Sequence, residues 1–243
     1  MNIKRIIKKM FRKINIDIVR YNYQTSESAR LAWLLKWKNI EYVLDVGANE
    51  GQYAQELFDT GFKGSIISIE PTSLAYQKLQ IRTQRQNQWK SLNLAMGESD
   101  GKVTINIAAN SQSSSILNML PLHEQSAPSS FYIAKEEVPI MTVDQLLVAE
   151  NISAKKLFLK IDAQGYENKI LSGASQSLPN IQGVELEMSL MPLYQGEKLF
   201  YELDNEMKTL GFTLMSLEPV FFSSKTHQVM QLNGIYFRLD TAL

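Results

Sequence analysis

A turn between an apolar run and a helical pattern is the part of the sequence best suited to hold a ligand. The run Val43 to Val46 breaks at Gly47, and Gly51 opens the helical pattern that follows. This order predicts a buried strand, a tight turn and a helix N-terminus, where backbone N–H groups meet a bound molecule. Glu70 ends the next apolar run, Ser65 to Ile69, where a carboxylate can accept hydrogen bonds from a ribose diol. The pattern indicates a nucleoside-containing cofactor.

The spacing of this turn is Asp45-x-Gly47-x-x-x-Gly51, which differs from the G-x-G-x-x-G of dinucleotide-binding proteins. With an acidic residue closing the second strand, it favours S-adenosylmethionine (SAM) over NAD. Gly47 allows the sharp turn and Gly51 lets the helix approach the ligand, while Asp45 could bridge through water to the amino-acid part of SAM. Asn49 tolerates the left-handed backbone angles of such a turn. An ordinary strand-to-helix turn is the alternative interpretation.

Two further carboxylates, Asp162 and Glu187, end later predicted strands on the same edge of the sheet. Asp162 should lie next to the methyl group of SAM, so we expect it to contact the cofactor and to act on the acceptor. Methyl transfer to a hydroxyl needs an in-line acceptor oxygen and removal of its proton. Asp162 could be the base, orient the acceptor or, with Glu187, ligate Mg²⁺ or Ca²⁺. Because no third ligand is evident, a metal-free carboxylate base is the preferred interpretation.

The remaining candidate residues carry weaker signals. Ala95 and Gly97 end the third predicted strand and are expected beside adenine, Gly97 through its backbone, although a simple turn explains them almost as well. Glu167 either complements the dipole of the helix that it begins or takes a direct part in the methyl transfer. The two histidines are His123, in an irregular loop, and His227, in a polar loop before the last strand. Either could be a general base, but a lone loop histidine is usually solvated.

Composition bounds the class of protein. With 243 residues the chain can form one large α/β domain. Basic and acidic side chains balance at 25 each, so no global field draws it to nucleic acid, and we expect no nucleic-acid partner. Absence of cysteine excludes disulfides and thiolate chemistry and fits a reducing compartment. No apolar stretch is long enough to cross a bilayer, and no secretion signal is evident. A cytoplasmic protein is expected.

The first 20 residues differ from the rest, because they carry seven basic side chains and one acidic one, Asp17. Apolar residues recur among them at helical spacing: Ile3, Ile6, Ile7, Met10, Phe11 and Ile14. A basic amphipathic helix of this kind can lie peripherally on an anionic membrane or pack on its own domain. We assign residues 1–38 to an N-terminal helical extension and 39–243 to the main domain. Trp33 and Trp37, four apart in a second helix, are expected to pack in the core.

Strand and helix patterns alternate along the main domain. Strands are expected at 43–47, 65–70, 91–96, 102–108, 138–141, 156–162, 181–188, 212–218 and 229–238, with helices near 52–60, 73–85, 142–149, 166–174 and 198–210. Five strand–helix alternations followed by two adjacent strands predict a mostly parallel seven-stranded sheet with an antiparallel last strand. Residues 109–136 are serine-rich and irregular, which is typical of a lid or substrate loop.

Four blocks of the sequence resemble FkbM-type methyltransferases, in the order found in that family. They are Val43–Gly51, Ser113-Ser-Ser-Ile-Leu117, Lys160-Ile-Asp-Ala-Gln-Gly-Tyr-Glu167, and Leu186-Glu187 with Pro192-Leu-Tyr194. The resemblance covers roughly residues 40 to 238 and is most specific in the K-I-D-x-x-G-x-E block. It implies a Rossmann-like, doubly wound fold and a SAM-dependent O-methyltransferase that acts on a hydroxyl of a sugar, glycan or small natural product. The basic first helix lies outside it.

Two other functions remain open at this point. One is a catalytically silent SAM-binding protein with a regulatory or scaffold role, which would need neither Asp162 nor Glu187. The other is an NAD-dependent oxidoreductase, which the Gly47-x-x-x-Gly51 spacing disfavours.

Overall fold

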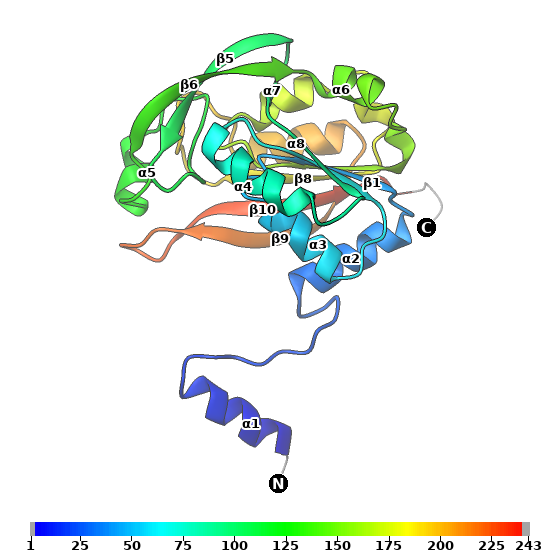
Figure 1. Ribbon diagram of the computed structural model, residues 1–243. Coiled ribbons are helices and arrows are strands. Elements are labelled where there is room, and N and C mark those ends of the chain that lie inside the picture. Colours follow the sequence, from blue (N-terminus) through cyan, green and yellow to red (C-terminus); the bar gives the residue numbers. More distant parts are fainter. Residues whose placement is uncertain (1–2, 240–243) are drawn as a thin grey trace.

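A computed structural model describes residues 3–239 (Figure 1). Its helices are α1 (Ile3–Arg12), α2 (Glu27–Trp37), α3 (Gln52–Asp59), α4 (Ser73–Thr83), α5 (Pro121–Ser126), α6 (Val143–Ala149), α7 (Glu167–Ser172) and α8 (Phe200–Thr209), with short 3₁₀ turns at Ala154–Lys156 and Leu178–Asn180. Its strands are β1 (Tyr42–Val46), β2 (Ser65–Ile69), β3 (Trp89–Leu92), β4 (Ala95–Met96), β5 (Gly101–Ala108), β6 (Tyr132–Met141), β7 (Leu157–Ile161), β8 (Gly183–Ser189), β9 (Thr213–Phe222) and β10 (Val229–Phe237).

The main sheet has seven strands in the order β3-β2-β1-β7-β8-β10-β9. β1, β2, β3, β7 and β8 pair in parallel, whereas β10 runs antiparallel to both of its neighbours. The predicted mostly parallel sheet with an antiparallel last strand is therefore confirmed. β10 does not lie at the edge, however, but between β8 and β9.

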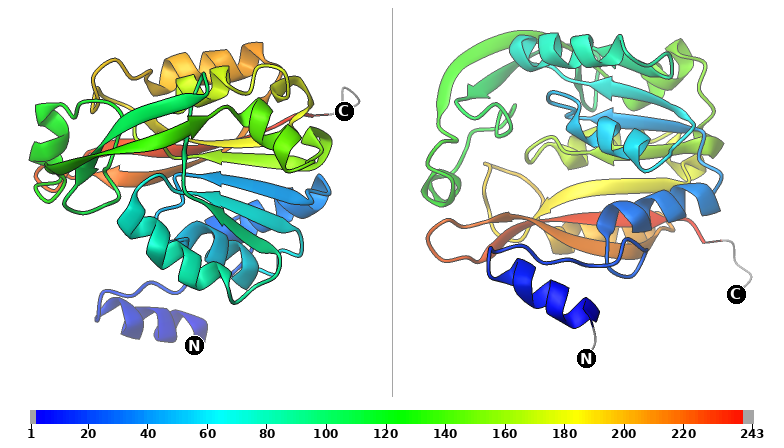
Figure 2. Two further views of the ribbon diagram at one scale, coloured as in Figure 1. Left: turned by 45° about the horizontal axis from the view of Figure 1, so that its top comes forward. Right: turned by 60° about the horizontal axis from the view of Figure 1, so that its bottom comes forward.

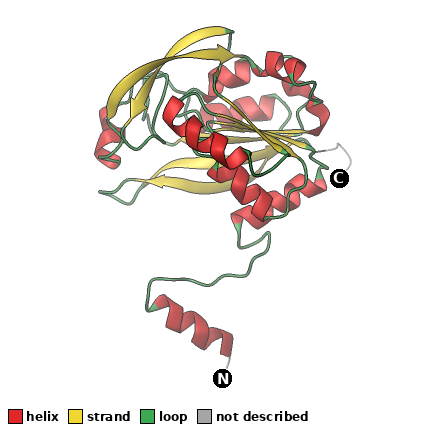
Figure 3. Ribbon diagram, in the orientation of Figure 1, coloured by secondary structure: helices red, strands yellow, loops and turns green. Residues whose placement is uncertain are grey.

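Apolar side chains on both faces of the strands explain why the sheet is covered by helices on both sides (Figure 3). In β7, Phe158 faces one core and Leu159 the other, because successive side chains of a strand point to opposite faces. The Phe158 core contains buried side chains of α2, α3 and α4. The Leu159 core contains those of α6, α7 and α8. The predicted doubly wound architecture is confirmed.

The segment after β2 differs from the prediction. The expected strand 91–96 is two strands, because Asn93 turns the chain by donating from Nδ2 to the carbonyl oxygens of Glu70 (2.9 Å) and Pro71 (3.0 Å). β3 completes the main sheet, while β4 starts a second, three-stranded sheet in the order β4-β6-β5. Residues 109–136 are also less irregular than expected, since they include α5 and the first half of β6. The two sheets are seen from two sides in Figure 2.

The N-terminal helices behave differently from each other. α2 buries Leu31, Leu34 and Leu35 in the core of the domain, while α1 stands apart from it (Figure 1). Trp33 and Trp37 stack on each other, with ring centroids 5.6 Å apart, but are 51% and 43% exposed. The prediction that they pack in the core was wrong. Their spacing places both rings on one side of α2, but it does not determine which side of the helix packs against the domain. Within residues 3–239, no helix has the length and apolarity needed to cross a membrane.

Candidate active site

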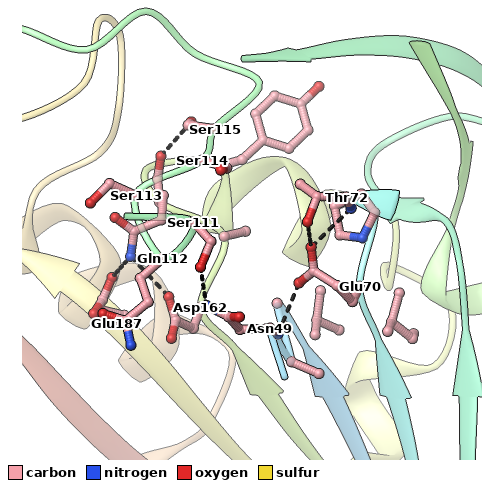
Figure 4. A pocket seen from close by; sticks show the side chains of 18 of the residues that line it. Asn49, Glu70, Thr72, Ser111, Gln112, Ser113, Ser114, Ser115, Asp162 and Glu187 are labelled. Carbon is pink, nitrogen blue, oxygen red and sulfur yellow. Dashed lines mark hydrogen bonds between the residues drawn. The ribbon is translucent and has the colours of Figure 1, made fainter. Parts of the chain in front are cut away.

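A cavity of about 520 Å³ opens at the carboxyl ends of the central strands. The chain leaves β1 toward β2 on one side and later returns to β7 on the other, so β1 and β7 form a topological switch point of the kind that binds ligands in open α/β sheets. The turn after β1, the ends of β2 and β7, and residues 110–116 all contribute to its lining. In Figure 4, Glu70 and Thr72 lie on one side, and Asp162 and Glu187 lie on the other.

The turn after β1 is shaped by close backbone contacts. Gly47 has φ +74°, and a Cβ there would stand 1.7 Å from the carbonyl oxygen of Asp162, so only glycine fits. Asn49 has φ +48°, as expected for a left-handed position. Gly51 (φ +86°) does not line the cavity, since its added Cβ would meet Trp89 at 2.6 Å and Leu79 at 2.8 Å. Gly51 thus serves packing behind the turn rather than approach to a ligand.

Glu70 is a buried cavity-lining carboxylate whose oxygens bind the two neighbouring loops. Its Oε1 accepts from the backbone N–H of Thr72 (2.9 Å) and from the Thr72 hydroxyl (2.5 Å), and its Oε2 accepts from the backbone N–H of Asn49 (2.8 Å). Burial raises the pKa of Glu70, while these hydrogen bonds oppose the shift. Because a carboxylate offers about four acceptor positions, Oε2 retains room for another donor from the cavity.

Asp45, expected to contact the ligand through water, is fully buried and outside the cavity lining. It accepts from the Ser68 hydroxyl at 2.9 Å and pairs with Lys160, whose Nζ is 3.2 Å from Oδ1. Lys160, a site residue that our sequence analysis missed, also lies 3.4 Å from Asp162 Oδ2 and 3.2 Å from the carbonyl oxygen of Gly47. Burial alone would lower the pKa of Lys160. The negative charges of Asp162, Asp45 and Glu185 outweigh this effect and raise the pKa. The sequence feature that could have identified Lys160 as a site residue is a lysine within an otherwise apolar strand.

Asp162 and Glu187 lie together at the ends of β7 and β8. Gln164 links them, because its Nε2 donates to Asp162 Oδ1 at 3.0 Å and to Glu187 Oε2 at 2.5 Å. Gln231 adds a donor to Glu187 Oε2 at 3.0 Å. Burial, followed by the charge of Asp162, raises the pKa of Glu187 well above the usual range. The Asp162 side chain is 34% exposed, and both carboxylates line the cavity.

A buried chain of hydrogen bonds holds Gln164, the residue that links this pair. The Tyr194 hydroxyl donates to Gln164 Oε1 at 2.6 Å, and His123 Nε2 lies 3.2 Å from the same hydroxyl. Ser130 Oγ lies 3.0 Å from His123 Nδ1, and Ser115 donates to the Gln164 carbonyl at 2.7 Å. Burial lowers the pKa of His123 to about 4. The blocks 113–117, 160–167 and 192–194, far apart in sequence, therefore meet around Gln164.

The other candidates fall outside this arrangement or at its border. Ala95 lines the cavity, but Gly97 does not, and its backbone N–H donates to Met141 in the second sheet at 3.0 Å. Glu167 is buried behind the cavity, where its Oε1 accepts from the N–H groups of Ala163 (2.9 Å) and Gly165 (3.2 Å). Burial raises its pKa to about 8. Glu167 thus shapes the turn before α7.

The structure does not bring His227 to the acidic pair. It lies exposed in the loop between β9 and β10, with φ +59°, and does not line the cavity. His123 does line it, although its imidazole is engaged on both nitrogens. In the described part of the chain, no group of three or more acidic, histidine or cysteine side chains is placed to hold a metal ion.

Comparisons with known proteins identify the family and the fold. A sequence profile of the Methyltransferase FkbM domain matches residues 45–214, so the chain belongs to the FkbM methyltransferase family. The fold is similar to that of methyltransferase FkbM from Methylobacillus flagellatus (TM-score 0.50, 17% identity), over 81% of this chain and 44% of that one. It is also similar to magnesium protoporphyrin IX methyltransferase from Synechocystis, solved with bound SAM (TM-score 0.45, 11% identity, 98% of both chains). Comparison with curated proteins gave no match.

The chain thus spans less than half of the Methylobacillus flagellatus protein. The family model identifies the FkbM methyltransferase family, and the structural similarity shows the Rossmann-like fold.

Proposed function

We propose that the protein is a SAM-dependent O-methyltransferase whose acceptor is an uncharged hydroxyl of a sugar, glycan or small natural product. The observation that carries this proposal is one cavity with two chemically different sides. Glu70 and the β1 turn form one side, suited to a nucleoside, and the linked carboxylates Asp162 and Glu187 form the other. A protein that only bound SAM would need no acidic pair beside the cofactor.

The residues on the nucleoside side fit SAM. Glu70 Oε2 can accept from a ribose hydroxyl, and Ala95 and Met96 offer an apolar wall next to it. Asn49 Oδ1 is buried and has no hydrogen-bond partner within the described chain, so it is an acceptor that a bound ligand can satisfy. The backbone of Gly47 also lines the cavity on this side.

The acidic pair supplies the chemistry on the acceptor side. SAM, when bound, provides an electrophilic methyl group. Asp162 accepts a hydrogen bond from the acceptor hydroxyl and removes its proton as the oxygen is alkylated. Glu187, whose pKa is raised by burial and by Asp162, orients the hydroxyl. Lys160, 3.4 Å from Asp162, balances the negative charge of the pair.

Uncharged polar side chains dominate the rest of the acceptor side. They are Ser111, Gln112, Ser113, Ser114, Gln231 and Asn233, and Val220 and Phe221 add apolar surface. Hydroxyls and amides suit a hydroxyl-rich ligand with an apolar ring face. The carboxylates beside them disfavour an anionic acceptor such as a phosphate ester. An uncharged sugar or natural product is therefore the substrate class that we propose, and nucleic acid is not.

Asp162→Asn tests the proposal, because it keeps size and hydrogen bonding but removes the charge of the base. Turnover on a panel of glycosides and hydroxylated small molecules, followed by S-adenosylhomocysteine release, should fall about 10²–10⁴-fold. The SAM dissociation constant from calorimetry should change little. Asp204→Asn, a carboxylate of α8 outside the cavity, is the matched control and should retain full turnover.

Each alternative has a distinct outcome. Normal turnover by Asp162→Asn would refute the assignment of the base and make Glu187 the leading candidate. SAM binding without turnover of any acceptor in the panel would favour the silent binding protein, and NAD binding would favour an oxidoreductase. Addition of EDTA should leave activity unchanged, because the base that we propose acts without a metal ion. We also propose that the enzyme is cytoplasmic.

A further inference from the structure

The charge of the chain is segregated, although its sum is zero. Residues 1–20 hold seven of the 25 basic side chains, whereas all but one of the 25 acidic side chains lie outside this segment. The exception is Asp17, whose carboxylate oxygens lie 3.1 and 3.0 Å from Nε and Nη2 of Arg12. The segment therefore carries a large local excess of positive charge.

The same segment exposes apolar side chains to water. Met10 and Ile14 are each 64% exposed, and Ile7 and Phe11 are 44% and 38% exposed. In the sequence, apolar residues recur three and four apart between residues 3 and 14, and basic residues fill the positions between them, so the two groups take opposite sides of a helix. α1 lies apart from the domain (Figure 1), and the domain thus leaves Ile7, Met10, Phe11 and Ile14 uncovered.

A second exposed feature lies where the segment joins the domain. Tyr23, Trp33 and Trp37 form a row, with ring centroids 6.1 Å and 5.6 Å apart, and the ammonium of Lys38 lies 4.6 Å from the Trp37 ring. All three aromatic side chains are more than 40% exposed. Aromatic rings with a polar edge, next to a basic residue, are typical of surfaces at a membrane–water interface.

We propose that α1 binds the surface of an anionic phospholipid membrane, with its apolar side among the acyl chains and its basic side at the headgroups, and that the Tyr23–Trp33–Trp37 row is a second contact with that surface. The local charge excess complements anionic headgroups, and the exposed apolar side requires an apolar environment. Two copies of α1 packed on each other would bring like charges together. Nucleic acid would leave the apolar side uncovered. The proposal does not depend on the methyltransfer reaction.

Vesicle flotation of the full chain tests the electrostatic part. Binding is expected to vesicles containing phosphatidylglycerol, not to pure phosphatidylcholine, and to weaken as salt is raised. Lys8→Glu/Lys9→Glu should weaken binding at least about 30-fold, since each basic side chain near such a surface contributes about 1 kcal/mol. Lys135→Glu/Lys155→Glu changes the net charge equally at exposed positions of the domain and should bind within about twofold of the natural chain.

The apolar and aromatic contacts need separate variants. Met10→Ser/Ile14→Ser leaves the charge unchanged and should also weaken vesicle binding. Because Trp89 is buried, a blue shift of tryptophan fluorescence on binding reports Trp33 and Trp37, and Trp33→Phe/Trp37→Phe should abolish it. SAM affinity and far-UV circular dichroism check that each variant is folded.

Several results would overturn the proposal. These are equal binding to neutral and anionic vesicles, equal loss in both charge-reversal variants, or binding to duplex DNA that exceeds binding to anionic vesicles. A dimer of the natural chain that Met10→Ser/Ile14→Ser dissociates, without vesicle binding, would instead assign the apolar side of α1 to a second copy. An unchanged fluorescence spectrum on vesicles would remove the aromatic row from the contact.

Discussion

Replacing Tyr194 by phenylalanine removes one oxygen atom from the centre of the buried hydrogen-bond chain. Tyr194 is 1% exposed, so water cannot replace the lost hydroxyl. The change leaves Gln164 Oε1 and His123 Nε2 without their partner. A buried polar group that loses its partner costs about 1–3 kcal/mol, so we expect the free energy of unfolding to fall by about 2–4 kcal/mol.

Tyr236→Phe is the matched control, because Tyr236 is also fully buried and loses the same atom. Its hydroxyl makes longer contacts, 3.3 Å to Asp204 Oδ1 and 3.6 Å to the sulfur of Met188, and Asp204 keeps its ion pair with Lys208 at 2.6 Å. We expect a loss of at most about 1 kcal/mol. Urea unfolding followed by tryptophan fluorescence measures both variants, and equal m-values would show that the unfolded states are comparable.

A double-mutant cycle with Gln164→Leu isolates the contact itself. If Tyr194 and Gln164 act as one unit, the double variant should be more stable than the sum of the single losses predicts, with a coupling of about 0.5–3 kcal/mol. Turnover of Tyr194→Phe should also fall, since Gln164 positions Asp162 and Glu187, while SAM affinity should hold. Equal losses in Tyr194→Phe and Tyr236→Phe, or strict additivity in the cycle, would refute the network.

Three further experiments test other parts of the site. Glu70→Ala should weaken SAM binding by about 1.5–3 kcal/mol in calorimetry, whereas Glu136→Ala, which removes a carboxylate bonded to Ser73 outside the cavity, should not. Because burial raises the pKa of Glu167 from 4.5 to about 8, its folded form favours the proton, and stability is lost as the pH rises through that interval. Unfolding free energy should fall about 1.4 kcal/mol per pH unit more steeply in the natural chain than in Glu167→Gln, and equal slopes would contradict the assignment. Chymotrypsin cleavage within residues 109–120 should slow when S-adenosylhomocysteine is bound, and unchanged cleavage would indicate a passive surface loop.

Strand ends were the predictable part of the site. Glu70, Asp162 and Glu187 each follow an apolar run, and the carboxyl ends of parallel strands meet at one edge, so sequence alone placed them together. Asp45 and Gly51 belong to the same motif, but neither lines the cavity. The motif spacing could not show this, because a strand alternates its side chains between two faces and the burial of each face depends on distant elements.

The residues that sequence analysis missed depend on contacts between distant segments. Gln164 meets Tyr194 and His123 only after the chain has folded, and no local pattern marks a glutamine as a link between two carboxylates. Asn93 likewise splits one expected strand into β3 and β4 through contacts to the end of β2. Trp33 and Trp37 show the same limit at the surface, since helical spacing fixes neighbours along α2 but not what covers them.

The contact between Gly47 and Asp162 has a consequence for protein engineering. The space between the Gly47 backbone and the carbonyl oxygen of Asp162 is too small for a methyl group. The backbones of β1 and β7 are therefore in direct contact where the two sides of the cavity meet. The spacing between cofactor and acceptor is then a property of the scaffold, not of the surrounding loops. Redesign of acceptor preference can therefore exchange residues 110–114 and the Val220–Phe221 wall while the transfer geometry stays constant, whereas any side chain at position 47 should disable every variant alike.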